Sequence, residues 1–143
     1  MTPSHVLVPL DGSPLADEAL AHALETFDCR ITVLNVVTPL DASMSEGGIL
    51  EPGDERIEEA HERANRLVER ASQQAAEANR PVETAVEAGD PADAILEYVD
   101  TSDVDHVVMG GHGGPQSVSA RLLGTVATTV VSQAPVTVTV VRA

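Results

Sequence analysis

The sequence predicts a three-layer α/β fold in which helices cover both faces of an open, five-stranded parallel sheet. Apolar runs rich in Val alternate along the chain with segments of helical period, as in parallel strands joined by helical crossovers. The chain has 143 residues, of which 43% are hydrophobic, and this size and apolar content are typical of one domain with an ordinary core. We therefore treat residues 1–143 as a single domain.

Five segments have the composition of strands. Residues 5–10, 31–37 and 106–110 are nearly continuous in apolar residues, as expected of strands buried on both faces. Residues 82–88 and 136–141 alternate between polar and apolar, which predicts the two edges of the sheet. With right-handed crossovers the strand order becomes 3-2-1-4-5, and the winding direction reverses between the first and fourth strands. The loops after these two strands should therefore face one ligand-binding crevice.

Four helices should connect the strands. The first has Ser13 as a potential N-cap and Pro14 at its first position, a favourable start for a helix. The longest should cover residues 54–79, with charged pairs one turn apart on its solvated face. The third should start at Asp90, and the fourth near Thr125. The buried stripe expected on the longest helix comprises Ile57, Ala60, Ala64, Leu67, Val68, Ala71 and Ala75.

The charge composition argues against several functions. The net charge is −15 and all eight basic residues are Arg, which disfavours nucleic acids and anionic membranes as partners because their phosphates require a positive surface. Such an acidic, Lys-free composition resembles that of proteins from halophilic archaea, where molar salt screens charges over about 3 Å. Neither a signal peptide nor an apolar run long enough for a membrane span is evident. We expect a cytoplasmic protein.

Residues that could support catalysis or hold a metal are sparse. Cys29 is the only cysteine, so neither an intrachain disulfide nor a cysteine-based metal cluster can form. The five His residues are scattered, and the Gly-Lys-Ser/Thr element of a P-loop ATPase does not occur. We expect neither a metal site nor catalytic residues. A slow hydrolase that uses His112 or Asp11 is the weakest of the alternatives.

A glycine-rich loop follows the fourth strand and leads to the last helix. Glycines allow a backbone to approach a pyrophosphate closely, and the N-terminus of the following helix attracts an anion. The loop is therefore either a phosphate cradle or simply a flexible turn with a glycine cap. The residues concerned are Met109, Gly110, Gly111, Gly113, Gly114, Gly124 and Thr125.

Two further segments should lie at the same crevice. Asp11 follows the first strand and could accept hydrogen bonds from ribose hydroxyls or an adenine amino group, or instead share the N-cap role of Ser13. Val36, near the end of the second strand, could offer an apolar wall to a base or belong to the core. Residues 38–53 form either a lid over the crevice or a solvated connection.

Taken together, these residues resemble a known family. The segments VPLDGS, LNVV, EAGDP, MGGHG, LLGTV and APVTVTVVR look like the universal stress protein family over nearly the whole chain. The resemblance implies the same five-stranded fold, of the adenine nucleotide alpha hydrolase kind. It also implies homodimers in which the last strand, here from Val136 to Val141, pairs with its copy across a two-fold axis. An edge strand without charges is suited to such pairing.

The resemblance also implies a ligand, ATP with Mg²⁺. Members of the ATP-binding branch are similar to Gly-x2-Gly-x9-Gly-Ser/Thr, a spacing that Gly111, Gly114, Gly124 and Thr125 match. In a second register, which starts directly after the Met, Gly110 and Gly113 take the first two positions. Arg121 is the one cation expected nearby and the chain has no Lys, so a Mg²⁺ ion would have to neutralise most of the phosphate charge. The implied binding residues are Pro9, Leu10, Asp11, Val36, Met109, Gly110, Gly111, Gly113, Gly114, Gly124, Thr125 and Val126.

Two functions follow from this resemblance. The leading hypothesis is a nucleotide-responsive homodimer of the stress response, with at most very slow ATP hydrolysis. The alternative is a stress protein of the branch that binds no nucleotide, in which the glycine loop is structural and the dimer surface carries the function.

Overall fold

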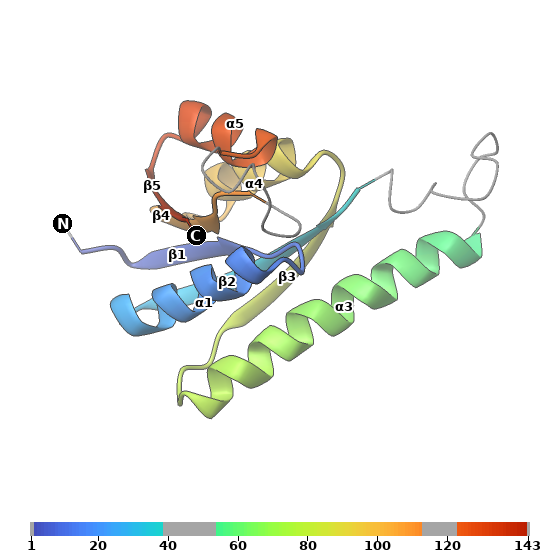
Figure 1. Cartoon of the computed structure of the whole chain (residues 1–143), viewed down its shortest axis with the longest axis horizontal. Coiled ribbons are helices and arrows are strands. Elements are labelled where there is room, and N and C mark those ends of the chain that lie inside the picture. Colours follow the sequence, from blue (N-terminus) through green and yellow to red (C-terminus); the bar gives the residue numbers. More distant parts are fainter. Residues whose placement is uncertain (1, 39–53, 113–122, 143) are drawn as a thin grey trace.

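A computed structural model of the chain describes residues 2–38, 54–112 and 123–142, and its described part contains five strands and four helices (Figure 1). The strands form one parallel sheet in the order β3-β2-β1-β4-β5, which confirms the predicted fold class and strand order. The elements are β1 (His5–Pro9), α1 (Pro14–Thr26), β2 (Arg30–Val37), α3 (Asp54–Glu77), β3 (Glu83–Ala88), α4 (Pro91–Thr101), β4 (His106–Gly110), α5 (Thr125–Gln133) and β5 (Thr137–Val141).

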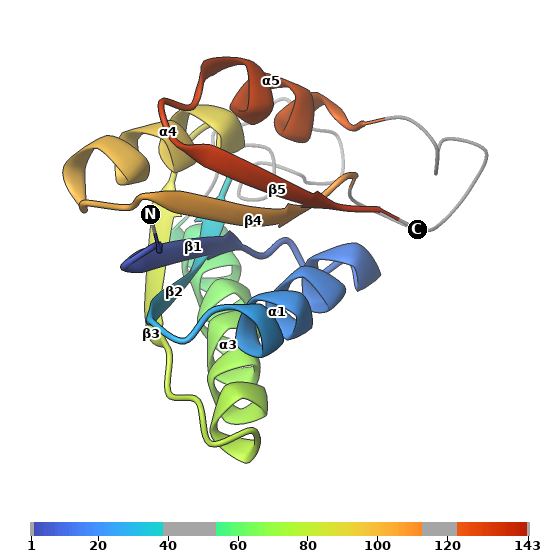
Figure 2. The same ribbon diagram turned by 90° about the vertical axis from the view of Figure 1, so that its left-hand side faces the viewer.

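The sheet separates two helical layers. Helices α1 and α3 cover one face, and α4 and α5 cover the other (Figures 1 and 2). In the central strand β1, Val6 and Val8 pack toward α1 and α3, whereas Leu7 packs toward α4. All three are fully buried, and burial of each such side chain stabilises the fold by about 1.5–3 kcal/mol. The continuous apolar run of β1 therefore reflects burial on both faces.

Local sequence signals explain where two helices start. Ser13 caps α1, with its hydroxyl oxygen accepting from the backbone N–H of Ala16 at 3.3 Å. Asp90 caps α4 in the same way through the N–H of Asp93, at 3.1 Å. A proline follows each cap at the first helical position, where its missing N–H has no intrahelical partner to lose. Both predicted starts are confirmed.

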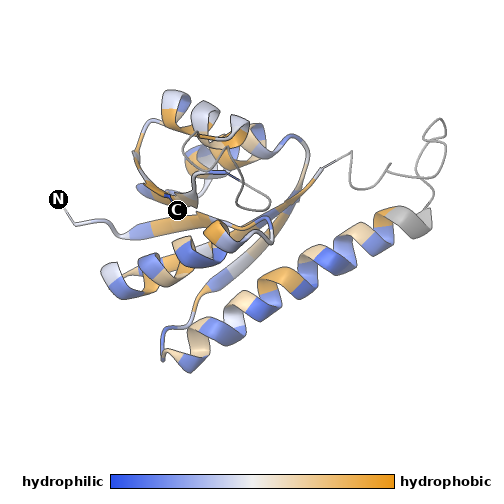
Figure 3. Ribbon diagram, in the orientation of Figure 1, coloured by the Kyte–Doolittle hydropathy of each residue, from blue (hydrophilic) through white to orange (hydrophobic). Residues whose placement is uncertain are grey.

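Helix α3 packs a stripe of small residues on β2 and β3, and in Figure 3 apolar and hydrophilic stretches alternate along it. Ala60 and Ala64 contact the cluster around Val37, the last residue of β2. The prediction that Ile57 belongs to the buried stripe is wrong, because its side chain is 39% exposed. Ile57 lies one turn before Ala60, where α3 has passed the end of β2, so no strand residue remains to cover it.

Arg80 joins the end of α1 to the connection between α3 and β3. Asn79 adopts a left-handed conformation with φ of 59° and ends the helical path, and the backbone N–H of Arg80 donates to Ala75 at 2.8 Å. The guanidinium of Arg80 donates to the backbone carbonyls of Leu24, Phe27 and Cys29. These carbonyls lie at and just beyond the C-terminus of α1, where a cation also opposes the helix dipole.

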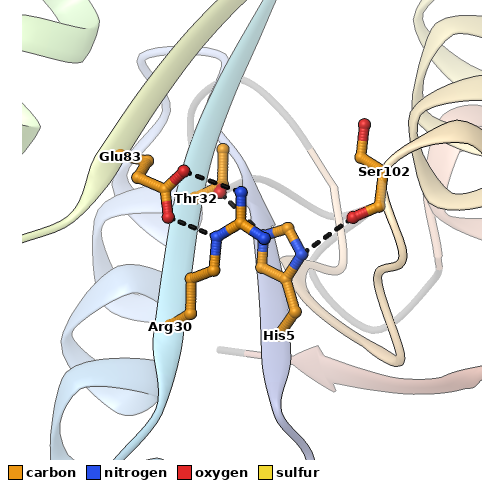
Figure 4. A network of polar contacts seen from close by, with 5 residues as sticks. All are labelled: His5, Arg30, Thr32, Glu83 and Ser102. Atoms are coloured by element: carbon orange, nitrogen blue, oxygen red, sulfur yellow. Dashed lines mark hydrogen bonds and ion pairs between the residues drawn. The ribbon is translucent and has the colours of Figure 1, made fainter.

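A polar network lies at the N-terminal ends of β1, β2 and β3 (Figure 4). His5 is buried, with Nδ1 3.0 Å from the carbonyl oxygen of Ser102 and Nε2 2.8 Å from the hydroxyl of Thr32. Since a carbonyl only accepts, Nδ1 carries the proton, and in the neutral ring Nε2 accepts from Thr32. Beside it, Arg30 and Glu83 form an ion pair between half-exposed side chains, where water screens the attraction.

No helix in residues 2–38, 54–112 or 123–142 is long and apolar enough to cross a membrane.

A second buried histidine makes the stability of the fold depend on pH. The ring of His106 packs at a tilt of 56° against Phe27 with centroids 4.7 Å apart, and its Nε2 lies 2.8 Å from the hydroxyl of Thr139. Burial lowers the pKa of His106, with His22 acting in the same direction and Asp105 against it. The unfolded chain therefore binds a proton at this site more readily than the folded chain does.

We accordingly expect the free energy of unfolding to fall as the pH drops below about 6.5, the ordinary pKa of His. Removal of the titrating ring by His106→Gln should flatten the pH dependence between pH 8 and pH 5, measured by denaturant unfolding. His61→Gln, at an exposed position of α3, is the control and should retain the wild-type slope. An unchanged slope in the His106 variant would contradict this account.

Candidate functional site

A cleft of about 570 Å³ lies at the C-terminal ends of β1, β2 and β4. Its floor is formed by the strand ends, including Pro9, Val36 and Met109. One wall comes from the start of α1 and from α3, and the opposite wall from the starts of α4 and α5. The crossover connections leave β1 and β4 in opposite directions, so this is the winding reversal at which open parallel sheets bind ligands.

Hydrogen bonds attach the loop after β1 to the end of β2 at the mouth of the cleft. The backbone N–H of Leu10 donates to the carbonyl of Leu34 at 2.8 Å, and the side-chain amide of Asn35 donates to the carbonyl of Leu10 at 2.7 Å. Gly12 follows with a φ of +85°, a conformation that favours glycine. This local structure brings the end of β1 and the end of β2 to one side of the cleft.

Asp11 combines a capping role with an exposed position. Its Oδ1 accepts from the backbone N–H of Ser13 at 2.9 Å, so the predicted capping alternative is present in the structure. Its side chain is exposed and lines the cleft. Oδ2 of Asp11 has no hydrogen-bonding partner among residues 2–38, 54–112 and 123–142. One carboxylate oxygen therefore remains for a ligand.

Close packing of β4 against α1 and β5, and of α5 against the end of β4, explains several of the glycines. A Cβ on Gly110 would lie 2.9 Å from Cβ of Leu15, and a Cβ on Gly124 would lie 3.2 Å from Cα of His112. The backbone N–H of Gly124 donates to the carbonyl of Gly111 at 2.6 Å, and the N–H of Gly111 donates to Val141 at 2.8 Å. These contacts attach the start of α5 to the end of β4.

The start of α5 faces the cleft with backbone donors that have no acceptor among residues 2–38, 54–112 and 123–142. Gly124 is its N-cap and makes no side-chain capping hydrogen bond, and the first turn contains no acidic residue. The first helical hydrogen bond runs from the N–H of Thr128 to the carbonyl of Gly124. The N–H groups of Thr125, Val126 and Ala127 thus have no acceptor within the helix. Together with the positive end of the helix dipole, they suit an anion.

Most of the predicted binding residues line this one cleft, although binding itself stays a prediction. Gly111 does not line it, since a Cβ there would point toward Val140 and Val141 of the neighbouring edge strand. Gly113, Gly114 and Arg121 lie outside the described residues, as do 39–53 of the suggested lid. The predicted residues around the cleft are Pro9, Leu10, Asp11, Val36, Met109, Gly110, Gly124, Thr125 and Val126.

Sequence reasoning missed one cation of the cleft. Arg121 was expected to be the nearby positive charge, but Arg63 of α3 lines the cleft. Its position beside Ala60 and Ala64 in the helical pattern could have indicated this, since those residues pack at the end of β2. The missing information was how far α3 extends past the sheet.

His112, named above for the hydrolase alternative, lines the cleft and is 9% exposed. Among the residues that the structure describes, no three His, Cys, Asp or Glu side chains come together in a way that could hold a metal ion. The described lining offers an apolar floor, one carboxylate, one guanidinium, the imidazole of His112 and a helix N-terminus.

Comparison with known sequences gives a consistent result over the whole chain. Residues 3–142 match the sequence model of the universal stress protein family. A universal stress protein of Methanocaldococcus jannaschii is 30% identical over 141 residues, covering 96% of this chain and 81% of that protein. One from Methanothermobacter thermautotrophicus is 29% identical over 140 residues, covering 96% of this chain and 94% of the relative.

Solved structures show the same fold. The universal stress protein UspA from Lactobacillus plantarum superimposes with a TM-score of 0.83 at 23% identity, covering 99% of both chains. The protein from Archaeoglobus fulgidus in complex with dAMP gives 0.68 at 22% identity, over 99% of this chain and 100% of that one. A family protein from Arabidopsis thaliana with AMP bound gives 0.67 at 20% identity, over 97% and 91%.

Proposed function

The chain belongs to the universal stress protein family, and on that premise we propose that it is an ATP-binding, nucleotide-responsive homodimer acting in the cytoplasmic stress response. One observation carries the proposal. The cleft at the winding reversal gathers an apolar floor, an exposed carboxylate and an uncapped helix N-terminus, which suit the base, ribose and phosphates of a nucleotide. Structures of the same fold with AMP and with dAMP support an adenine nucleotide as the ligand class.

The proposed ligand orientation follows the chemistry of the two ends of the cleft. The base would lie against Pro9 and Val36, and the free carboxylate oxygen of Asp11 would accept from a ribose hydroxyl. The phosphates would point toward the N–H groups of Thr125 and Val126. Of the two registers of the glycine motif, the one that begins at Gly110 agrees with the cleft, since Gly110 lines it and Gly111 does not. This register places ten residues, rather than the nine of the ATP-binding motif, between Gly113 and Gly124.

Mg²⁺ would enter with the nucleotide. The described residues offer no cluster of carboxylates for a separate ion, so phosphate oxygens and water would supply most of its ligands. We expect at most very slow hydrolysis, since the proposed orientation engages both carboxylate oxygens of Asp11, one with Ser13 and the other with the ribose. The site would then act by binding.

A second candidate function is a protective or interaction protein that binds no nucleotide. The observation in its favour is that Gly110 and Gly124 each have a packing reason to be glycine, so these residues alone do not require a phosphate. In this case the edge of β5 would be the functional surface. Nucleotide titration of the wild-type protein distinguishes the two candidates.

The ribose contact gives the first test. Asp11→Asn keeps an oxygen that can accept from Ser13 N–H, so the fold should persist, but it removes the charge and the second acceptor. Wild-type protein in molar KCl should bind Mg·ATP at least about tenfold more tightly than Mg·2′,3′-dideoxy-ATP, because hydrogen bonds to a charged group contribute roughly 1.5–3 kcal/mol. Calorimetric titration should show that Asp11→Asn loses most of this difference.

Asp17→Asn is the matched control, since Asp17 is an exposed carboxylate on α1 that does not line the cleft. It should keep the wild-type preference for ATP. If Asp11→Asn discriminates between the two nucleotides as well as the wild type does, Asp11 does not contact the ribose.

The proposed dimer uses the free edge of β5. The carbonyl of Val141 accepts from Gly111, so Val141 directs its backbone groups toward β4. Backbone groups alternate in direction along a strand, and Val140 therefore directs its N–H and C=O away from the sheet. The outer edge carries no charged side chain from Thr137 to Val141, which favours pairing with a second copy.

Substitution of Val140 by proline tests this edge. Val140→Pro removes an outward N–H without breaking a bond to β4, and proline is tolerated at sheet edges. In light scattering coupled to size exclusion, the wild type should have the mass of a dimer and the variant that of a monomer. Val140→Thr keeps both the N–H and the side-chain shape and should remain dimeric. A dimeric Val140→Pro protein that melts like the wild type would refute pairing through this edge.

A further inference from the structure

The arginines of this acidic chain are used in different ways. Arg30 pairs with Glu83, Arg66 pairs with Glu62, and Arg80 donates to backbone carbonyls. Arg63 differs from these, since within residues 2–38, 54–112 and 123–142 it has neither an ion-pair partner nor a hydrogen-bond partner. Glu59, one turn earlier on α3, is in position for a helical pair but does not form one. The guanidinium of Arg63 is therefore available.

The position of Arg63 directs this free charge to the cleft. Ala60 and Ala64 pack against Val37 at the end of β2, and Arg63 lies between them in the sequence and lines the cleft from α3. In Figure 1 the N-terminal end of α3 extends past the strand ends. Arg63 thus comes from the wall that faces the starts of α4 and α5.

The charge balance of the cleft makes this residue important. Of the described lining residues, Asp11 and Arg63 carry the full charges, one of each sign. Without Arg63 the described lining would be net negative in a chain of net charge −15, and it would repel an anionic ligand. Arginine also has the planar donor fork that matches phosphate oxygens.

We infer that Arg63 binds the phosphate group of the nucleotide and supplies the positive charge that lets this acidic protein hold an anion. The inference rests on the proposed function. It assigns to α3 a binding role alongside the loops after β1 and β4. It also predicts that the base and ribose bind without Arg63, whereas binding of the phosphates depends on it.

The test compares two arginines of one helix. Arg63→Gln removes the charge at the cleft. Arg70→Gln removes the same charge from an exposed site two turns farther along α3, about 10.5 Å away. Dissociation constants for Mg·ATP and for adenosine are measured by calorimetry in molar KCl, with thermal midpoints to confirm that both variants fold.

Arg63→Gln should weaken Mg·ATP binding by at least about tenfold and change adenosine binding less than twofold. Arg70→Gln should leave both constants near the wild-type values, and Arg63→Lys should recover part of the ATP affinity. Equal ATP affinities in the Arg63→Gln and Arg70→Gln proteins would overturn the inference while leaving the proposed function intact. Equal losses for ATP and adenosine would also overturn it, since they would indicate a contact with the base or a change in the cleft.

A wild-type protein that binds neither ligand would contradict the proposed function itself, and the inference with it. A wild type that binds adenosine as tightly as Mg·ATP would contradict the inference and the proposed phosphate contacts with α5, because no phosphate contact would then contribute to affinity. The proposed site for the base and ribose would remain.

Discussion

The cleft follows from the handedness of the crossover connections. The two connections that leave β1 and β2 run on one face of the sheet, and those that lead to β4 and β5 run on the other (Figure 2). Parallel crossovers are right-handed. The connection after β1 therefore leads to β2 on one side of the middle of the sheet, and the connection after β4 leads to β5 on the other side. No helix can then cover the C-terminal ends of these two strands. The loops that begin there, with Asp11 and with Gly110, necessarily meet across a gap.

Most of the fold could be predicted from the sequence because burial leaves a direct trace in it. A strand covered on both faces must be apolar throughout, and an edge strand alternates, so strand order followed from composition. The starts at Ser13 and Asp90 were equally readable, since capping is a local interaction. The error at Ile57 has a different origin. Helical period shows which face of α3 is apolar but not where the sheet beneath it ends.

The site was less predictable because its geometry depends on the tertiary arrangement, which helical period and residue spacing do not show. Spacing placed glycines after β4 but did not show which way each one faces, and Gly111 turns toward β5 while Gly110 borders the cleft. Arg63 was missed because its role depends on how far α3 extends past β2, a tertiary feature. The glycines also illustrate that packing and binding can select the same residue. Gly124 allows α5 to approach His112, and that approach is what brings the helix N-terminus to the cleft.

Nucleotide occupancy of the protein as purified is the most direct test of the central claim. Small molecules released by denaturing the wild-type protein would be identified by mass spectrometry, and the emptied protein would then be titrated with Mg·ATP in molar KCl. The account predicts co-purified ATP or AMP, or binding in the micromolar range. A protein that releases no nucleotide and does not respond to Mg·ATP would contradict it and would leave the β5 edge as the place to look for function.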